Sequence, residues 1–135
     1  NCCHAALPGM VNEKRGRIVT IISDAGRIGE ARLASYSAAK AGAAGFTRAI
    51  ARETGRYGIT ANAVSLSTLE PPIDEEEMAA FMASERTKNQ LSRYTIRRFG
   101  KPQEVADMVL FLCSNSAAWI TGQTYPVNGG YSFAQ

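Results

Sequence analysis

Two short strand-like runs constrain the fold of this chain more than any other feature. RIVTIIS at residues 17–23 is rich in β-branched residues and has apolar side chains on both faces, and ITANAV at 59–64 reads as a second buried strand. A helical pattern fills residues 34–56 between them. Strands with two apolar faces are typical of parallel sheets, whose crossover connections are usually helices. This order predicts an α/β fold.

The remaining elements continue the alternation. Residues 1–14 are expected to carry the end of a helix that Pro8-Gly9 disturbs, and 24–33 to form a polar loop. Asp74 followed by Glu77 resembles a capping box, which starts a helix running to about residue 90. Another helix begins near Pro102, and QTYPVNGG reads as a last strand. Helical spacing marks two apolar stripes: Ala39, Ala43, Phe46 and Ile50, and then Val105, Met108, Val109 and Leu112.

Bulk composition limits the function classes. The chain has 135 residues, enough for one domain, with 45% hydrophobic and 20% charged residues and a formal net charge of +3. Short basic clusters at 14–17 and 97–101 are interpreted as solvated faces, so no nucleic-acid partner is expected. No apolar run reaches the length of a membrane span, and no signal peptide is visible.

Cysteine usage indicates the compartment. Three cysteines with two adjacent do not form a disulfide framework, and they favour a reducing, cytoplasmic setting. Cys2-Cys3-His4 lacks a second ligand pair, so we expect no metal site. The chain begins with Asn1 in what reads as mid-helix, and we interpret it as a piece of a longer protein.

The candidate chemistry lies at the start of the long helix. Tyr36 and Lys40 are four residues apart, so they share one helix face. A phenol titrates near pH 10, and a neighbouring ammonium favours its ionised form, so the pair can act as a proton donor and acceptor. Such a pair also arises by accident in many chains.

Ser23 strengthens the hypothesis. It ends the first strand thirteen positions before Tyr36, and the connecting loop is long enough to return the chain, so both hydroxyls can meet above the sheet edge. Ligands of open α/β sheets bind beyond the carboxyl ends of the strands. The other interpretation is a strand-end serine that satisfies a loop amide.

These residues together resemble the short-chain dehydrogenase/reductase family. The resemblance rests on Ser23, on YSAAK at residues 36–40, on ITANAV and on the terminal ITGQTYPVNGG, and it covers essentially the whole chain. GRIVTIISDAGRIG and KPQEVADMVLFLCSNSAAWITGQ are similar to the 3-oxoacyl carrier-protein reductase-like branch. The resemblance implies a Rossmann-like, doubly wound parallel sheet, of which residues 1–135 form one domain that is only the carboxyl-side portion.

The resemblance also implies a reaction. A hydride would pass between NAD or NADP and a small-molecule alcohol or ketone, with Tyr36 as general acid/base. Lys40 would assist Tyr36 and hold the nicotinamide ribose, and Ser23 would hold the substrate oxygen. Backbone near Leu69 and the position of Ser67 would lie beside the nicotinamide. The family also implies a homo-oligomer, a dimer or tetramer, built on the Ala/Gly-rich helix and the helix at residues 2–10.

Two departures from the family pattern stand out. The glycine-rich loop that would cradle the cofactor pyrophosphate is absent from residues 1–35, and so is the catalytic asparagine. The Pro-Gly usual after the second strand reads Leu66-Ser67. We therefore expect the isolated 135-residue piece to bind cofactor weakly and to be inactive.

Two other functions stay open. A truncated or drifted chain could survive as a non-catalytic structural or oligomerisation module, and an isomerase or lyase could use the same Tyr/Lys pair. Substrate identity is not readable. Residues 65–95 are expected to cover the substrate, and their apolar members suggest a lid of some hydrophobic character: Met78, Phe81, Met82 and Leu91.

Overall fold

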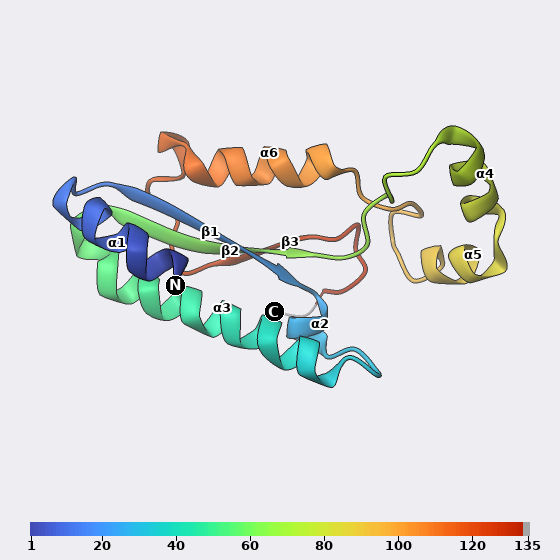
Figure 1. Cartoon of the computed structure of the whole chain (residues 1–135), viewed down its shortest axis with the longest axis horizontal. Coiled ribbons are helices and arrows are strands. Elements are labelled where there is room, and N and C mark those ends of the chain that lie inside the picture. The colour runs from blue at the N-terminus through green and yellow to red at the C-terminus, as the bar shows by residue number, and fades with distance from the viewer. Residues whose placement is uncertain (134–135) are drawn as a thin grey trace.

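The sheet of this protein is parallel and three-stranded. The computed structural model describes residues 1–133, and its strands are β1 (Gly16–Ser23), β2 (Ile59–Leu66) and β3 (Thr124–Val127). Their spatial order is β1-β2-β3, and both pairings are parallel. The predicted α/β architecture with a parallel sheet is confirmed, and β2 occupies the centre (Figure 1).

The two long strands differ in burial. Every residue of β2 except Leu66 is buried, as expected for a strand between two neighbours with both faces covered. In β1, by contrast, Ile22 is buried while Ile21 is 41% exposed. The prediction that both runs form buried strands is therefore wrong for β1, because β1 pairs with β2 alone and lies at the edge.

Helices cover the two faces of the sheet. Helices α1 (Cys2–Asn12) and α3 (Ala34–Thr54) lie on one face, and α6 (Pro102–Cys113) lies on the other (Figure 1). Helix α1 runs through Pro8 without a break, which differs from the disturbance predicted there. A 3-10 turn, η1 (Gly55–Tyr57), follows α3 and ends at Gly58, whose φ of 72° is the left-handed conformation that glycine adopts easily.

The buried face of α3 is not the predicted one. Its buried residues are Ala44, Thr47, Ile50, Ala51 and Thr54. Of the predicted stripe only Ile50 is buried, whereas Phe46 is 50% exposed. The helix packs alanine, threonine and isoleucine on the sheet and turns the aromatic side chain outward, because smaller side chains allow closer approach of the backbones.

The apolar stripe of α6 is confirmed. Val105 and Leu112 are buried and form one cluster with Val64 and Ala117, against which Met108 and Val109 also pack. Pro102 occupies the first turn of α6, where its missing N–H costs nothing. A short 3-10 turn, η2 (Asn115–Ala117), leads from α6 towards β3.

Short helices interrupt the connections at the carboxyl edge of the sheet. The predicted loop 24–33 contains one helical turn, α2 (Ala25–Ile28). The single helix predicted up to residue 90 is two helices, α4 (Glu75–Ala83) and α5 (Glu85–Leu91). Asp74 caps α4 as predicted, accepting a hydrogen bond from the Glu77 amide at 2.8 Å. Ser84 separates the two helices because it is extended, with ψ of 140°, and caps α5 through its hydroxyl.

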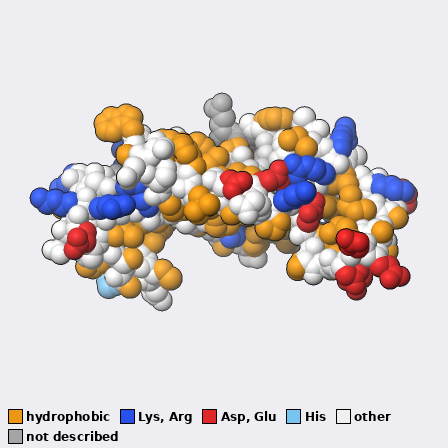
Figure 2. Space-filling view, turned by 90° about the horizontal axis from the view of Figure 1, so that it is seen from above, with side chains coloured by type: hydrophobic (Ala, Val, Ile, Leu, Met, Phe, Trp, Pro, Cys, Tyr) orange, Lys and Arg blue, Asp and Glu red, His pale blue; other side chains and the backbone are white. Residues whose placement is uncertain are grey.

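The surface over α6 is partly apolar. Figure 2 shows hydrophobic side chains across the middle of this face, with acidic and basic groups beside them. Leu110 is 65% exposed and Trp119 is fully exposed. None of the helices formed by residues 1–133 has the length and hydrophobicity that crossing a membrane requires.

Candidate functional site

A cavity of about 680 Å³ opens at the carboxyl ends of the strands. The pairing register sets Ser23 of β1 opposite Leu66 of β2, so the segments that follow both strands leave the sheet side by side. Ser23, Tyr36 and Ser67 all line the cavity. The structure thus brings together, at the predicted edge, three of the five residues that the sequence singled out.

Ser23 is fixed by the turn that follows it. Its Oγ accepts a hydrogen bond from the amide of Ala25 at 3.2 Å, which is the local interaction expected of a strand-end serine. Ser23 still lines the cavity, so this local bond does not remove the residue from the site.

Gly26 allows the turn to sit close to α3. A Cβ at this position would lie 2.7 Å from the backbone nitrogen of Ala41 and from the carbonyl carbon and Cβ of Lys40. No side chain fits in that space, so only glycine permits α2 to pack against this turn of α3. The contact sets the position of Ser23 relative to Tyr36 and Lys40.

Tyr36 and Lys40 form the expected pair on the first turns of α3. The Lys40 Nζ lies 5.7 Å from the centroid of the Tyr36 ring. The same Nζ donates a hydrogen bond to the carbonyl oxygen of Ile21 at 3.2 Å, an acceptor on the free edge of β1. Tyr36 is 44% exposed and lines the cavity, while Lys40 stands behind it, outside the lining.

The segment after β2 is held by Tyr94. The Tyr94 hydroxyl is hydrogen bonded to the Ser67 Oγ and accepts the Thr68 amide at 3.1 Å. Ser67 occupies the position where the family resemblance implies glycine, and its side chain is held by the hydrogen bond to Tyr94. Leu69 does not line the cavity, and it pairs with Gly100 in an isolated parallel bridge.

A buried carboxylate that we did not predict from the sequence holds together the segments at the base of the cavity. Asp24 is 2% exposed. Its Oδ1 accepts from Ser65 at 2.8 Å and from Arg27 at 3.1 Å, and its Oδ2 accepts from Asn128 at 2.6 Å and Ser132 at 3.0 Å. These donors tie the turn after β1 to β2 and to the last segment of the chain. The only sign of this role in the sequence was the position of Asp24, an acidic residue directly after the end of a predicted strand.

A second polar group closes one side of the cavity. The Tyr131 hydroxyl donates to Glu30 Oε2 at 3.0 Å, and the Arg93 guanidinium lies 4.6 Å from the Tyr131 ring centroid. Burial raises the pKa of Tyr131, and the hydrogen bond and negative charge of Glu30 raise it further. Tyr131 therefore stays neutral at physiological pH and is a hydrogen-bond donor to Glu30.

The expected apolar lid is not what faces the cavity. Helix α5 supplies the polar lining residues Arg86, Asn89 and Gln90, and Arg93 follows two positions after the helix ends. Phe81 turns away and packs on Phe99 with ring centroids 5.7 Å apart. Met78 and Met82 line a separate hollow of about 390 Å³ on α4. The break at Ser84 causes this difference, because α5 then turns its own face to the site independently of α4.

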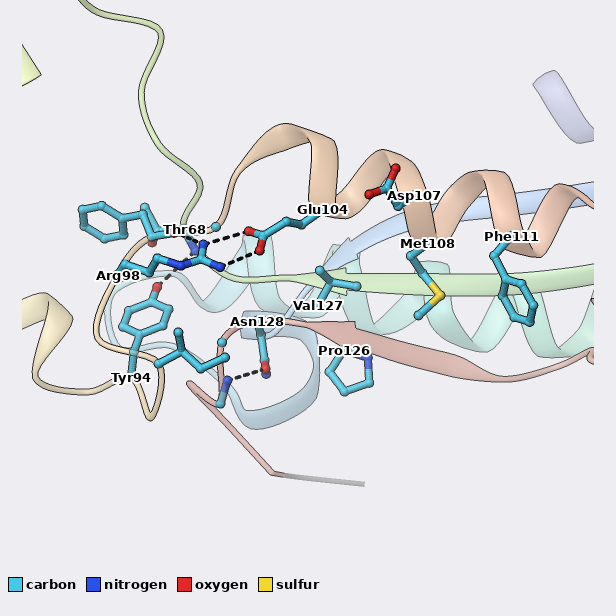
Figure 3. A pocket seen from close by; sticks show the side chains of 15 residues that line it. Thr68, Tyr94, Arg98, Glu104, Asp107, Met108, Phe111, Pro126, Val127 and Asn128 are labelled. Carbon is cyan, nitrogen blue, oxygen red and sulfur yellow. Dashed lines mark hydrogen bonds and ion pairs between the residues drawn. The ribbon is translucent and has the colours of Figure 1, made fainter. Parts of the chain in front are cut away.

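Another cavity, of about 570 Å³, lies under the start of α6 (Figure 3). Its walls come from α6, the segment 94–100 and the end of β3. Arg98 and Glu104 form a two-fold hydrogen-bonded ion pair there, which holds the pKa of Glu104 at about 2. Since Ser23, Tyr36 and Lys40 do not line it, we regard the cavity above β1 and β2 as the candidate site.

Comparisons with known proteins agree with this architecture. The sequence model of a family described as enoyl-(acyl carrier protein) reductase matches residues 1–132. The chain is 41% identical over 126 residues to 3-oxoacyl-acyl-carrier-protein reductase FabG of Vibrio cholerae, covering 93% of this chain and 50% of that protein. It is 42% identical to FabG of Pseudomonas aeruginosa, covering 93% and 49%. The chain thus spans about half the length of the curated relatives it matches.

Solved structures show the same relationship. A 3-oxoacyl-acyl-carrier-protein reductase from Brucella melitensis superposes with a TM-score of 0.86 at 37% identity, covering 97% of this chain and 48% of that one. A structure titled "Dehalogenation enzyme" superposes with a TM-score of 0.87 at 33% identity, covering 96% and 53%. Similar chains therefore carry different titles on one fold, so the reaction must be argued from the site.

Proposed function

The chain belongs to the short-chain dehydrogenase/reductase family, and from that premise we propose that its site interconverts an alcohol and a ketone by hydride transfer with a nicotinamide cofactor. The observation that carries the proposal is one cavity lined by both Ser23 and Tyr36, with the Lys40 ammonium 5.7 Å from the Tyr36 ring centroid.

Each of the three residues has a distinct task in this proposal. Tyr36 donates a proton to the substrate oxygen in reduction and removes it in oxidation. Lys40, on the same face of α3, would stabilise negative charge on the phenol oxygen during the proton transfer. Ser23, oriented by the Ala25 amide, donates a hydrogen bond to the same substrate oxygen and stabilises the charge that develops on it.

The residues of this chain fit one end of NAD or NADP. A phenol hydroxyl and an ammonium on one face of α3 suit the hydroxyls of a nicotinamide ribose, so Tyr36 and Lys40 would hold that ribose. Ser67 and the backbone at Leu69 are proposed to lie near the nicotinamide. When bound, the cofactor supplies the hydride. A glycine-rich phosphate cradle does not occur within residues 1–35, so we propose that the diphosphate is held by chain outside this sequence.

Substitution of Tyr36 tests the proposal. In the complete polypeptide that carries this sequence, Tyr36→Phe should lower NAD(P)H-dependent turnover of a panel of ketones by about 10²- to 10⁴-fold, the range that general acid–base catalysis contributes. Tyr57→Phe is the matched control, because Tyr57 lies beyond α3 and stacks on Arg56. Unchanged activity in Tyr36→Phe would remove the assigned role.

The non-catalytic alternative has less support. A drifted module would not need the hydroxyls of Ser23 and Tyr36 in one cavity, and the departure at Ser67 is compensated by its bond to Tyr94. Titration of the complete polypeptide with NADH and NADPH separates the two hypotheses, since a structural module would bind neither. Product analysis separates net oxidation from an isomerase or lyase reaction.

We also propose that the protein works as a homo-oligomer. Phe46 is 50% exposed on the outer face of α3, and Ile50 and Ala51 form the inner face together with Leu7 of α1. Exposed large apolar side chains on a packed helix are typical of interfaces. Light scattering should give a dimer or tetramer for the complete polypeptide, and Phe46→Glu should shift it towards monomer.

A further inference from the structure

Helix α5 presents a hydrogen-bonding stripe to the candidate site. Three of its residues line the cavity at helical spacing and share one face of the helix, and Arg93, two positions after the helix ends, continues the spacing. That face meets the cavity that holds the Ser23 and Tyr36 hydroxyls. The stripe consists of Arg86, Asn89, Gln90 and Arg93.

Two members of the stripe anchor the helix. Gln90 Nε2 donates to Thr68 Oγ1 at 2.8 Å, which ties α5 to the segment after β2. The Arg93 NH1 lies 3.5 Å from Glu30 Oε1, and its guanidinium stacks on Tyr131. These contacts fix which face of α5 points into the cavity.

The other two members of the stripe have hydrogen-bond donors that no described residue accepts. Within residues 1–133, Arg86 and Asn89 are exposed at the cavity mouth, and their side chains make no hydrogen bond or ion pair. The solvent side of α5 is formed differently, by Glu85 and Lys88, which pair with each other at 2.8 Å. The free donors therefore gather on the cavity side of the helix.

The charges around the cavity leave Arg86 uncompensated. Asp24 is balanced by Arg27 at 3.1 Å, and Glu30 is balanced by Arg93. Both acidic residues of the lining are thus neutralised by partners in the protein, whereas Arg86 has none among the residues described. The four charged lining residues sum to zero, but because Asp24 is paired with Arg27 from outside the lining, the Arg86 guanidinium is left as the charge that a ligand can neutralise.

We propose that Arg86, assisted by Asn89, binds an anionic group on the substrate, and that the substrate is a small hydroxy or oxo acid. A guanidinium presents a planar pair of N–H groups that matches a carboxylate. This inference rests on the proposed function for the reacting end of the molecule. A cavity of about 680 Å³ has room for a small acid beside the nicotinamide.

Paired substrates test the inference. We would measure kcat/KM of the complete polypeptide for 2-oxo acids of three to six carbons, each against its own methyl ester. Dihydroxyacetone phosphate against dihydroxyacetone distinguishes a phosphate from a carboxylate. The inference expects one acid to exceed its ester by at least about tenfold, the factor for one charge-assisted hydrogen bond.

Two variants of matched charge locate the effect. Arg86→Met should lower kcat/KM for the preferred acid by about 10- to 100-fold and leave its ester within about twofold. Lys88→Met removes the same charge from the solvent side of α5 and should change neither value. Preference for the esters, or an equal loss on acid and ester in Arg86→Met, would overturn the inference while leaving the reductase proposal intact. Preference for the phosphate over every 2-oxo acid would replace the carboxylate by a phosphate and overturn the substrate class.

Equilibrium binding tests the anion site even if the protein turns over no carbonyl compound. Calorimetry with 2-oxobutyrate on the wild type and on Arg86→Met needs no catalysis. Binding that Arg86→Met weakens by at least about tenfold would support the anion site even though the reductase proposal had failed. Absence of binding to the wild type would overturn the anion site as well.

Discussion

At the scale of single residues, the site depends on two positions that do not touch the reacting atoms. Gly26 provides the space that lets α2 lie against α3, and Asp24 collects hydrogen bonds from three parts of the chain. Both lie in the turn after β1, directly beyond Ser23. The position of the Ser23 hydroxyl is therefore determined by packing and by buried hydrogen bonds together.

Gly26→Ala should destabilise the protein by about 1–3 kcal/mol, the usual cost of forcing a methyl group into a filled space. The added Cβ would meet the backbone of Ala41 at 2.7 Å, which cannot move without shifting α3. Gly42→Ala is the control, because nothing lies within 4 Å of its Cβ, and it should stabilise α3 by about 0.5–1 kcal/mol. Urea unfolding of both variants measures the difference, and equal effects would contradict the packing argument.

Asp24→Ala should cost about 3 kcal/mol or more of unfolding free energy, because it leaves the buried Ser65 and the partly buried Arg27, Asn128 and Ser132 without their acceptor. Ser132→Ala removes only one of these donors and should cost about 1 kcal/mol. Thermal or urea unfolding gives both values. A loss for Asp24→Ala no larger than that for Ser132→Ala would show that the network is not cooperative.

At the scale of elements, helix caps and helix breaks decide which side chains each helix presents to its neighbours. Ser84 ends α4 and caps α5, so α5 rotates its polar face to the cavity. Glu104 caps the start of α6, where it accepts the Lys101 amide at 2.8 Å and pairs with Arg98. The Arg98–Glu104 pair joins α6 to the segment that also carries Tyr94.

This pair predicts a pH dependence. Arg98 and the Lys101 amide hold the pKa of Glu104 at about 2, below its ordinary value of 4.5. A lowered folded-state pKa contributes stability that is present above pH 4.5 and is lost as pH falls towards 2. The pair is exposed to solvent, so the contribution is reduced by screening.

Glu104→Gln should therefore lower stability at pH 7, and the difference from wild type should shrink as pH falls from 4.5 towards 2. Glu53→Gln, an exposed residue at the end of α3, is the control and should show no such convergence. Urea unfolding between pH 2 and pH 7 checks both. A Glu104→Gln difference that does not change with pH would mean that the ion pair contributes nothing.

At the scale of the whole molecule, the free edge of β1 is the dominant feature. Among the described residues β1 pairs only with β2, and the Asp24 amide donates to the Leu66 carbonyl oxygen at 2.9 Å, so the backbone N–H and C=O groups of the even-numbered residues point towards β2. The odd-numbered ones face outward, and the Ile21 carbonyl there accepts Lys40. An unpaired edge invites a further strand, consistent with relatives about twice as long as this chain.

Hydrogen exchange of the 135-residue chain should follow this alternation. The amides of Val19 and Ile21 should exchange much faster than those of Thr20 and Ile22, whereas the amides in the middle of β2 should be uniformly protected. Exchange measured by NMR residue by residue gives the pattern. Equal protection along β1 would mean that another chain or segment already covers the edge.

Local patterns in the sequence determined much of this protein. The β-branched run at 17–23, the long helix, the cap at Asp74 and the stripe from Val105 to Leu112 all follow from nearest-neighbour preferences, and each was confirmed as an element. Ser23 and Tyr36 could be placed together because β1 ends at the carboxyl edge of the sheet and the helix that follows begins at that edge.

Only the tertiary structure decided the rest, because the remaining features depend on contacts between distant segments. The edge position of β1 follows from what pairs beside it, not from its own residues. The inward face of α3 is set by close approach to the sheet, which favours Ala44 over Phe46. The hydrogen-bond donors to Asp24 come from segments up to 108 positions apart, so no local pattern in the sequence announces them. The hydrogen-bonding stripe is a local pattern, but only the packing of α5 shows that it faces the cavity.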